Sequence, residues 1–140
     1  MAQQDFGPVS GWDSPVTVIS AQTLRITLKK DSVASDSGIS STMALPNGSA
    51  YELGFNVKFH TDFDWSLGGK AGFGFGIGNG NTGCRVPTDG GGGSLRIMWY
   101  NDTKAKRVYF RPYIYHAGMS GPCGSNFNKT YPITGIRFHM

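Results

Sequence analysis

The clearest strand signal in the chain is an alternation of apolar and polar residues between positions 51 and 60. The apolar positions all fall on one side: Tyr51, Leu53, Phe55, Val57 and Phe59. Because successive side chains of a β-strand point to opposite faces, this spacing predicts a half-buried strand with its apolar side on the core. Residues 23–29 alternate in the same way. Shorter strands are expected at 15–20, 71–77 and 134–140, and no segment holds a helical period.

Two further segments, 94–100 and 107–115, predict a β-hairpin. The intervening residues 101–106 are polar and turn-forming, so the two segments are expected to pair as neighbours. On the core side we expect Leu95, Ile97, Trp99, Val108, Phe110 and Ile114. Pro112 has no backbone N–H to donate, which favours an edge or a bulge at the far end of the second strand.

The other face of this hairpin carries an uncommon mixture of side chains. It combines hydroxyl, guanidinium and phenol groups: Ser94, Arg96, Tyr109, Arg111, Tyr113 and Tyr115. A face that only meets solvent more often carries Thr, Lys and Glu. The mixture therefore favours a binding surface, with an ordinary solvated face as the alternative.

The composition agrees with an all-β chain rich in turns. Of 140 residues, 21 are Gly and 13% are aromatic, and long helix-favouring runs of Ala, Leu, Glu and Lys are absent. The length suits a single domain over residues 1–140. Apolar runs stay shorter than a membrane span, so we expect no membrane partner.

The net charge of +4 is unevenly distributed along the chain. Residues 1–66 carry four Lys/Arg against seven Asp/Glu, whereas residues 67–140 carry nine against two. A basic half of this kind indicates an anionic partner, which could be a nucleic acid, a membrane surface or an acidic polysaccharide. A plain solvated basic surface is the alternative.

Two cysteines and three N-glycosylation triplets are typical of an extracellular protein. Cys84 and Cys123 permit one disulfide, which would close a loop of about 40 residues and stabilise the fold by about 4 kcal/mol. The triplets begin at Asn47, Asn101 and Asn128. Residues 1–5 contain no apolar signal core, so either a signal peptide has been removed or the protein is intracellular. Together with the cysteines and the triplets, this favours a secreted protein.

No metal site and no cofactor are predicted. The three His and two Cys residues are scattered, without a spacing typical of metal ligands. Residues 78–83 match the dinucleotide pattern GxGxxG, but no helix follows and no βαβ unit surrounds them. We assign these glycines to tight turns and to close backbone approach.

Three stretches of the chain carry a family resemblance: Val57–Lys70, Gly93–Tyr100 and Val108–Arg111. In order, spacing and residue types they are similar to the motifs of polysaccharide lyase family 14, the alginate and glucuronan lyases. The run Val57–Lys70 is similar to the family's turn from a strand ending in Lys-Phe to Gly-Gly-Lys. The runs Gly93–Tyr100 and Val108–Arg111 are similar to its Ser-x-Arg-x-Met-Trp strand and to the tyrosine-bearing strand that follows. The resemblance implies a jelly-roll β-sandwich of antiparallel strands that binds an acidic polysaccharide on its concave sheet.

The resemblance also implies β-elimination on a uronate polysaccharide, which leaves an unsaturated uronic acid at the new chain end. It places Lys70, Ser94, Arg96 and Tyr109 in the catalytic cleft. Cationic Lys70 and Arg96 would offset the uronate carboxylate, whose charge otherwise hinders removal of the C5 proton. Tyr109 is the candidate for proton transfer with Lys70 as its partner, and Ser94 is a candidate for hydrogen bonding to the substrate.

The remaining positions of this face are assigned to substrate binding. Arg111 stands where the family carries a second tyrosine, and Tyr113 and Tyr115 are candidates for stacking on sugar rings. His116 adjoins them and is a further candidate for proton transfer. Each residue also has a structural interpretation, because a tyrosine in a strand more often packs than reacts.

The chain departs from the family at its end and leaves two other functions open. It stops at Met140, where the family domain continues with further strands, so we expect a jelly roll cut short at its carboxyl end. A non-catalytic carbohydrate-binding module would use the same face without a proton-transfer pair. A nucleic-acid-binding β domain would explain basic charge interleaved with tyrosine, but the acidic first half argues against it, and we expect no nucleic-acid partner.

Overall fold

The computed structural model describes an all-β chain. The described residues are 9–10, 17–20, 23–32, 38–88, 90–105, 107–133 and 138–139. They form ten strands and no helix, and each paired strand runs antiparallel to its neighbour. The all-β prediction is confirmed. In this described part of the chain, no helix is long and apolar enough to cross a membrane.

The chain divides into two compact units, residues 1–49 and residues 50–140, and the expectation of a single domain stays a prediction. In the first unit, two strand pairs form separate two-stranded sheets. Their bounds are β1 (Val9–Ser10) with β4 (Thr42–Met43), and β2 (Thr17–Ser20) with β3 (Thr23–Ile26). The strand expected at 23–29 therefore ends at Ile26, and both Ile26 and Leu28 are exposed rather than buried.

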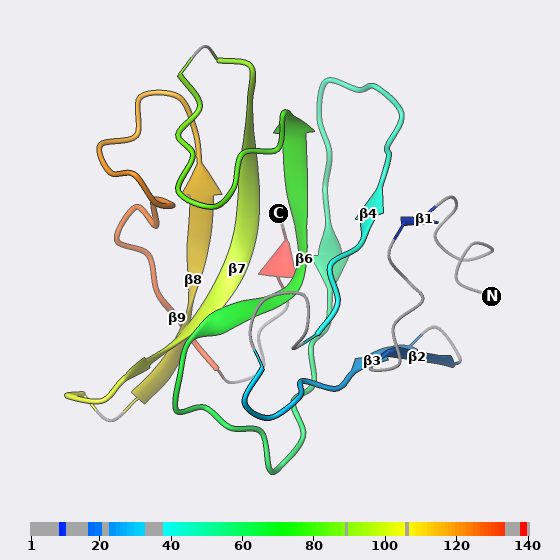
Figure 1. The fold of residues 1–140 in the computed structure, drawn as a ribbon, viewed down its shortest axis with the longest axis vertical. Helices are drawn as coiled ribbons and strands as arrows, with labels where there is room; N and C mark the ends of the chain where they lie inside the picture. The colour runs from blue at the N-terminus through cyan, green and yellow to red at the C-terminus, as the bar shows by residue number, and fades with distance from the viewer. Residues whose placement is uncertain are drawn as a thin grey trace. The chain divides into compact units, whose positions relative to one another are not determined.

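The second unit is built around a four-stranded antiparallel sheet in the order β6-β7-β8-β9 (Figure 1). Its strands are β6 (Gly69–Gly78), β7 (Gly92–Asp102), β8 (Arg107–Tyr115) and β9 (Tyr131–Pro132). A separate pair joins β5 (Gly54–Phe55) to β10 (Phe138–His139). The strand expected at 71–77 lies within β6. The one expected at 134–140 is seen only as β10, because 134–137 and 140 lie outside the described residues.

Strands β7 and β8 form the predicted hairpin in continuous register. Their Cα partners run from Ser94 and Tyr115 at one end to Asp102 and Arg107 at the other. At the turn, the Asp102 carboxylate accepts hydrogen bonds from two backbone amides of the turn, at 3.1 and 2.9 Å. The pairing of β9 with β8 lies on the turn side of Pro112 and stops short of it. Pro112 thus stands where β8 is a sheet edge, as its missing N–H requires.

The core of this unit lies on one face of the four-stranded sheet, where Phe55, Ile97, Trp99 and Phe110 are buried. Half-buried residues from the segment before β6 pack against them: Leu53, Val57, Phe59, Phe63 and Trp65. Four of the five apolar residues of 51–60 therefore meet the core as predicted, whereas Tyr51 is exposed. The segment pairs as a strand only at β5, and ring packing holds the remainder, with the Phe59 ring centroid 5.9 Å from that of Phe110.

Trp99 is the central side chain of this core. Its ring meets those of Phe63 and Trp65 edge to face, with centroids 5.3 and 6.4 Å apart. Its indole N–H donates to the Leu67 carbonyl oxygen at 2.8 Å, so the polar atom of the ring is paired. Opposite Trp99 on β6 stands Gly69, where a Cβ would overlap the indole ring. Glycine is required there because the indole already fills the space.

The pairing of β6 with β7 is irregular between Ala71 and Phe75. Gly72, inside this irregularity, has a φ of +70° and meets the Phe55 ring so closely that a side chain would overlap it. A residue with a Cβ would be strained by the backbone and would also collide with the ring. The irregularity therefore depends on glycine for two separate reasons.

We expect Gly69→Ala to destabilise the fold. The added methyl group must displace the Trp99 indole, and overpacking of this kind costs about 1–3 kcal/mol. Gly76→Ala on the same strand is the matched control, because its nearest atom is the Gly80 Cα at 3.6 Å, an ordinary contact. Urea unfolding followed by tryptophan fluorescence measures both variants. Equal unfolding midpoints would contradict the fit of Trp99 against Gly69.

Candidate functional site

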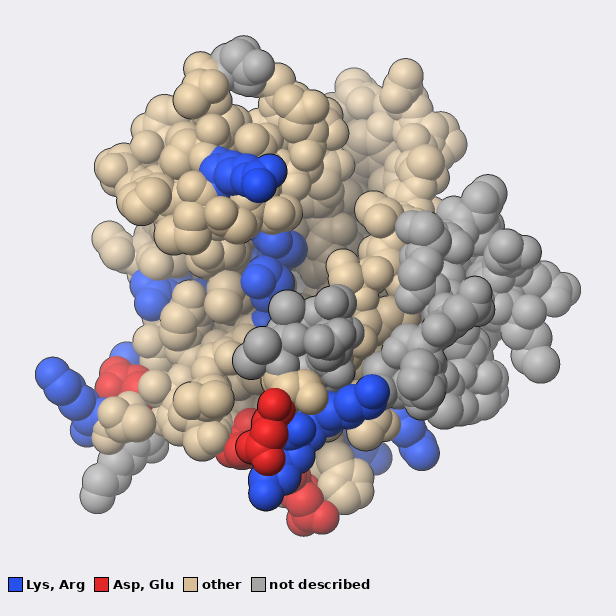
Figure 2. All heavy atoms as spheres, in the orientation of Figure 1, with Lys and Arg blue, Asp and Glu red and all other residues tan. Residues whose placement is uncertain are grey.

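The face of the sheet opposite the core gathers the polar residues that alternation predicts. Pairing places Ser94, Arg96, Met98 and Tyr100 of β7 beside Tyr115, Tyr113, Arg111 and Tyr109 of β8, respectively. Lys70 of β6 pairs with Met98 from the other side. We call these nine residues the basic–aromatic face. Figure 2 shows blue atoms of Lys and Arg among tan atoms in the region of β7 and β8.

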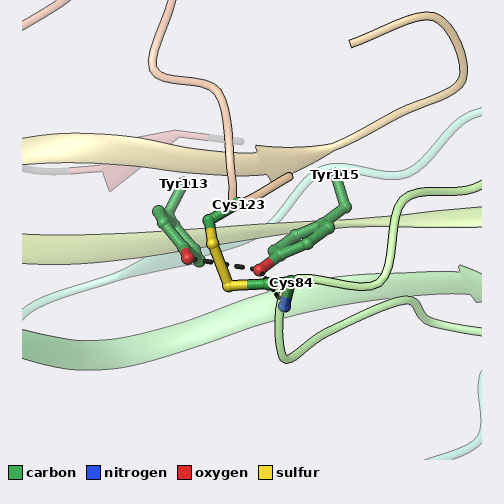
Figure 3. The surroundings of a disulfide bond; sticks show 4 residues. All are labelled: Cys84, Tyr113, Tyr115 and Cys123. Atoms are coloured by element: carbon green, nitrogen blue, oxygen red, sulfur yellow. Dashed lines mark hydrogen bonds between the residues drawn. A yellow bond between two sulfur atoms is a disulfide. The ribbon is translucent and has the colours of Figure 1, made fainter. Parts of the chain in front are cut away.

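Two tyrosines near the end of β8 share a hydrogen bond on this face. The hydroxyl oxygens of Tyr113 and Tyr115 lie 3.2 Å apart (Figure 3). The backbone amide of Cys84 donates to the Tyr115 hydroxyl at 2.9 Å. Only 1% of Tyr115 is exposed, so these hydrogen bonds replace the ones that its hydroxyl would make to water.

The surroundings of the two hydroxyls shift their pKa values in opposite directions. Burial raises the pKa of Tyr113, and the hydrogen bond to Tyr115 raises it further. Burial also acts to raise the pKa of Tyr115, but other effects outweigh burial and bring that pKa below its usual value. These are the hydrogen bond from Tyr113, the backbone amides of Cys84 and Gly124, and the positive charge of Arg96. Because the two groups interact they titrate as a pair, and the hydroxyl that favours ionisation is that of Tyr115.

Arg96 is held in place by its own strand and by the loop that follows β6. Its Nη2 donates to the Ser94 hydroxyl at 2.9 Å and to the Asn81 carbonyl oxygen at 3.4 Å. The Ser94 hydroxyl donates to the same carbonyl at 2.7 Å. The guanidinium carbon lies 5.3 Å from the ring centroid of Tyr115 and 5.6 Å from that of Tyr113. Arg96 is therefore a fixed positive charge beside the tyrosine pair.

Lys70 approaches the same pair from the neighbouring strand. Its ammonium nitrogen lies 5.8 Å from the Tyr113 ring centroid, and the residue is exposed. Tyr113 thus interacts with two cations, Lys70 from β6 and Arg96 from β7. The structure places an exposed amine, a hydrogen-bonded guanidinium and two phenols with pKa values shifted in opposite directions within one part of the face.

A second cluster lies at the end of the face next to the turn between β7 and β8, which we call the turn-side end. The rings of Tyr100 and Tyr109 stack with centroids 6.1 Å apart and planes 18° apart. The Arg111 guanidinium lies 5.0 Å from the Tyr100 ring, and that of Arg107 lies 5.4 Å from the Tyr109 ring. Of the residues predicted from the sequence, Tyr109 and Arg111 belong to this cluster, whereas the cation–ring contact of Lys70 is with Tyr113.

Three residues of this region were not singled out from the sequence. The alternation of residues 94–100 predicts Met98 and Tyr100 on this same face, and the pairing confirms it, but neither residue was assigned a role. Asn81 acts through its backbone carbonyl oxygen, which accepts from both Ser94 and Arg96. A backbone group is not signalled by any residue type, so sequence reasoning could not have found it.

The predicted disulfide between Cys84 and Cys123 is present beside the tyrosine pair (Figure 3). Gly124 follows it and lies against the Tyr113 ring, where a Cβ would be 2.7 Å from ring carbons. A β-bridge between Ile114 and Ser125 fastens this segment to β8. The disulfide therefore joins the loop after β6 to the segment after β8 at the tyrosine pair.

The predicted candidate His116 interacts with the segment that follows β8. Its ring stacks on Phe127 with centroids 5.3 Å apart, and its Nδ1 lies 2.8 Å from the Ala117 carbonyl oxygen. Among the residues that the structure describes, no group of three or more His, Cys, Asp or Glu side chains could hold a metal ion.

Comparison with known proteins identifies similar solved structures. No family model and no curated protein match the chain. The structure of alginate lyase Aly36B is similar, with 47% sequence identity and a TM-score of 0.87 over 99% of this chain and 58% of that chain. Substituted forms of Aly36B in complex with an alginate trisaccharide and with an alginate tetrasaccharide are also similar, each at 45% identity and a TM-score of 0.87.

The chain spans less than two thirds of the length of these similar structures, with 58–59% of each covered. The likeness supports a relation to polysaccharide lyases. Membership of polysaccharide lyase family 14 stays a prediction, because no family model matches.

We expect the tyrosine pair to produce a distinct step in a spectrophotometric titration of the phenol groups. Tyr115→Phe should remove the step at lowest pH, because that hydroxyl has the lowered pKa. Tyr113→Phe should move the step to higher pH, because Tyr115 loses a hydrogen bond that favours its ionised form. Tyr131→Phe, in exposed β9, is the control and should leave it in place. A lowest step that survives Tyr115→Phe would show that another tyrosine ionises first.

Proposed function

We propose that this chain carries the catalytic face of a polysaccharide lyase that cleaves an acidic uronate polysaccharide by β-elimination. The observation that carries the proposal is the grouping of Lys70 and Arg96 around the hydrogen-bonded pair Tyr113 and Tyr115 on one face of a sheet. The likeness to alginate lyase Aly36B supports it.

The proposed reaction requires a base, an acid and a positive field. A base removes the C5 proton of a uronate, the C4–C5 double bond forms as the C4–O4 bond breaks, and an acid protonates the departing O4. The neighbouring carboxylate gains negative charge on the way, so a cation fixed beside it lowers the barrier. Arg96 suits that role because hydrogen bonds to Ser94 and to the Asn81 carbonyl oxygen hold its guanidinium in place.

We assign the proton transfers to Lys70 and the tyrosine pair. Lys70 and Tyr113 lie together, so one can take the C5 proton while the other supplies a proton to O4. Tyr115 has the more stabilised ionised form, and it can exchange a proton with the Tyr113 hydroxyl through their hydrogen bond. Ser94 shares the Asn81 carbonyl with Arg96 and supports the position of that guanidinium.

The second cluster of the face is proposed to bind a neighbouring sugar. Tyr109, the sequence-based candidate for proton transfer, stacks on Tyr100 and presents aromatic surface at the turn-side end. Arg111 adds a cation there that can pair with a second uronate carboxylate. A chain of uronates lying on the basic–aromatic face would then meet a positive charge at successive residues.

The substituted forms of Aly36B offer a further parallel. One replaces a lysine and a methionine by alanine and is bound to an alginate trisaccharide; the other replaces a lysine and a tyrosine and is bound to a tetrasaccharide. The lysine and the methionine are separated by the same number of residues as Lys70 and Met98, which are paired neighbours on the face. This spacing supports a role for Lys70 in the reaction and a place for Met98 at the site.

Alginate is the substrate that we propose first, because the similar structures are complexes of an alginate lyase with alginate oligosaccharides. Glucuronan is the second candidate, since it carries the same carboxylate on C5. We further propose that the second unit is part of a jelly-roll sandwich, as the sequence resemblance implies. A secreted location agrees with the disulfide, which is rare in reducing compartments.

We expect Lys70→Ala to abolish elimination while the protein stays folded. The measurement is the rise in ultraviolet absorbance of the unsaturated uronate during incubation with alginate and, separately, with glucuronan. Loss of a proton-transfer group lowers the rate by about 10²–10⁴-fold. Lys104→Ala, in the exposed turn between β7 and β8, removes the same charge away from the tyrosine pair and should keep near-normal activity.

A comparison of Tyr113→Phe with Tyr109→Phe separates the two tyrosine candidates. The geometry predicts that Tyr113→Phe lowers kcat by about 10²-fold or more and that Tyr109→Phe mainly raises KM. The reverse pattern would return the proton-transfer role to Tyr109. A folded protein that binds alginate but gives a flat absorbance trace would refute the lyase and leave a carbohydrate-binding module.

A further inference from the structure

The disulfide of this protein lies beside the groups proposed to transfer protons, because Cys84 hydrogen-bonds the Tyr115 hydroxyl through its backbone amide. Figure 3 shows the disulfide of Cys84 and Cys123 beside Tyr113 and Tyr115, whose hydroxyls hydrogen-bond each other. The two cysteines are 39 positions apart in the sequence and come from different connections of the sheet. A disulfide that served only to close a loop would need no particular place on the sheet, so its position raises the question of a second role.

Each half of the disulfide brings a backbone amide to the tyrosine hydroxyls. The Cys84 amide donates to the Tyr115 hydroxyl at 2.9 Å. Gly124, the residue after Cys123, lies against the Tyr113 ring, and its backbone amide acts to lower the pKa of both hydroxyls. Backbone amides that point at a phenol oxygen stabilise its ionised form, as the donors of an oxyanion hole do.

The two amides are not held equally well by the rest of the fold. The Gly124 side is fastened to β8 by the bridge between Ile114 and Ser125, with N···O distances of 2.9 and 2.7 Å. Cys84 lies within the turn Thr82–Arg85, which we call the loop tip and in which the Arg85 amide donates to the Thr82 carbonyl oxygen. The disulfide is the covalent link between this loop tip and the better-anchored segment.

The backbone of Cys84 itself indicates that the loop tip is held in place. Its φ is +60°, in the left-handed region that costs a non-glycine residue about 1–3 kcal/mol unless the surroundings impose it. In this conformation the Cys84 amide meets the Tyr115 hydroxyl. The disulfide at the same residue is well placed to impose that conformation.

We propose that the Cys84–Cys123 disulfide is a positioning element of the active site, which holds the backbone amides of Cys84 and Gly124 on the Tyr113–Tyr115 hydroxyl pair. This inference rests on the proposed lyase function. Reduction of the bond by a dithiol yields two protein thiols and the oxidised reagent, so it removes no atom from the site. Its effect on the tyrosines arises because the loop tip, with the Cys84 amide, is no longer tied to the pair.

The first experiment compares the full chain before and after mild reduction and thiol blocking, beside the double variant Cys84→Ser with Cys123→Ser. Far-ultraviolet circular dichroism and thermal melting report whether each form is folded. For folded forms we expect the lowest tyrosine step to move to higher pH and kcat to fall by about 10-fold or more, while alginate binding stays within a few-fold. Unchanged titration and unchanged kcat in a folded, reduced protein would overturn the proposal.

A second pair of variants keeps the disulfide and tests the same contact, in case reduction unfolds the chain. Gly124→Ala places a methyl group against the Tyr113 ring and must push the amide or the ring aside. Gly121→Ala is the matched control, because its nearest atom is the Cys123 carbonyl oxygen at 3.9 Å. We expect Gly124→Ala alone to shift the tyrosine step and lower kcat. Identical behaviour of the two variants would overturn the proposal.

The two readouts distinguish this inference from the proposed function. If the unmodified protein shows no elimination, the lyase assignment fails, but the titration still reports whether the disulfide positions the tyrosine pair. If elimination is present and the tyrosine step is insensitive both to reduction and to Gly124→Ala, the lyase stands and the positioning role fails.

Discussion

The register between β7 and β8 is the constraint on which the rest of the second unit depends. Because paired residues share a face, a register that sets Trp99 opposite Phe110 on the core side also sets Arg96 opposite Tyr113 on the other side. A slip of one residue would bring cations into the aromatic core and the core rings into solvent. The buried rings therefore protect the arrangement of the basic–aromatic face, although they touch none of the proposed chemistry.

The glycines of β6 connect the core to the position of Lys70. Gly69 stands where the Trp99 indole needs space, and Gly72 stands where the Phe55 ring does. Lys70 lies between them in sequence and is held in register opposite Met98. A strand with larger residues at these glycines would sit farther from the core, and its lysine would move away from the Tyr113 ring. Small residues on one side of β6 thus determine where the amine lies on the other.

Two kinds of feature could be predicted from the sequence: those that follow from the two-residue period of a strand, and the disulfide, because the chain has only two cysteines. The hairpin, its two faces and the pairing of Cys84 with Cys123 belong to these two kinds. The strand expected at 51–60 was overextended, because its apolar side chains reach the core by ring packing rather than by a backbone ladder. Alternation also shows which face a tyrosine occupies but not which cation it meets. For that reason Tyr109 could be chosen over Tyr113 before the contact of Lys70 was known.

Arg96 can pair with two different anions, the ionised hydroxyl of Tyr115 and a uronate carboxylate of the substrate, and the two compete for its charge. It lies beside Tyr115, whose ionised form it stabilises, and it is the cation proposed to face the uronate carboxylate. As the pH rises and the phenol loses its proton, the attraction that Arg96 exerts on an incoming polyanion is partly cancelled, while the phenolate becomes a stronger proton acceptor. Binding of the polymer is therefore favoured at lower pH, where the phenol is protonated, and removal of its proton at higher pH, where the phenol is ionised. Turnover at limiting substrate should peak at an intermediate pH.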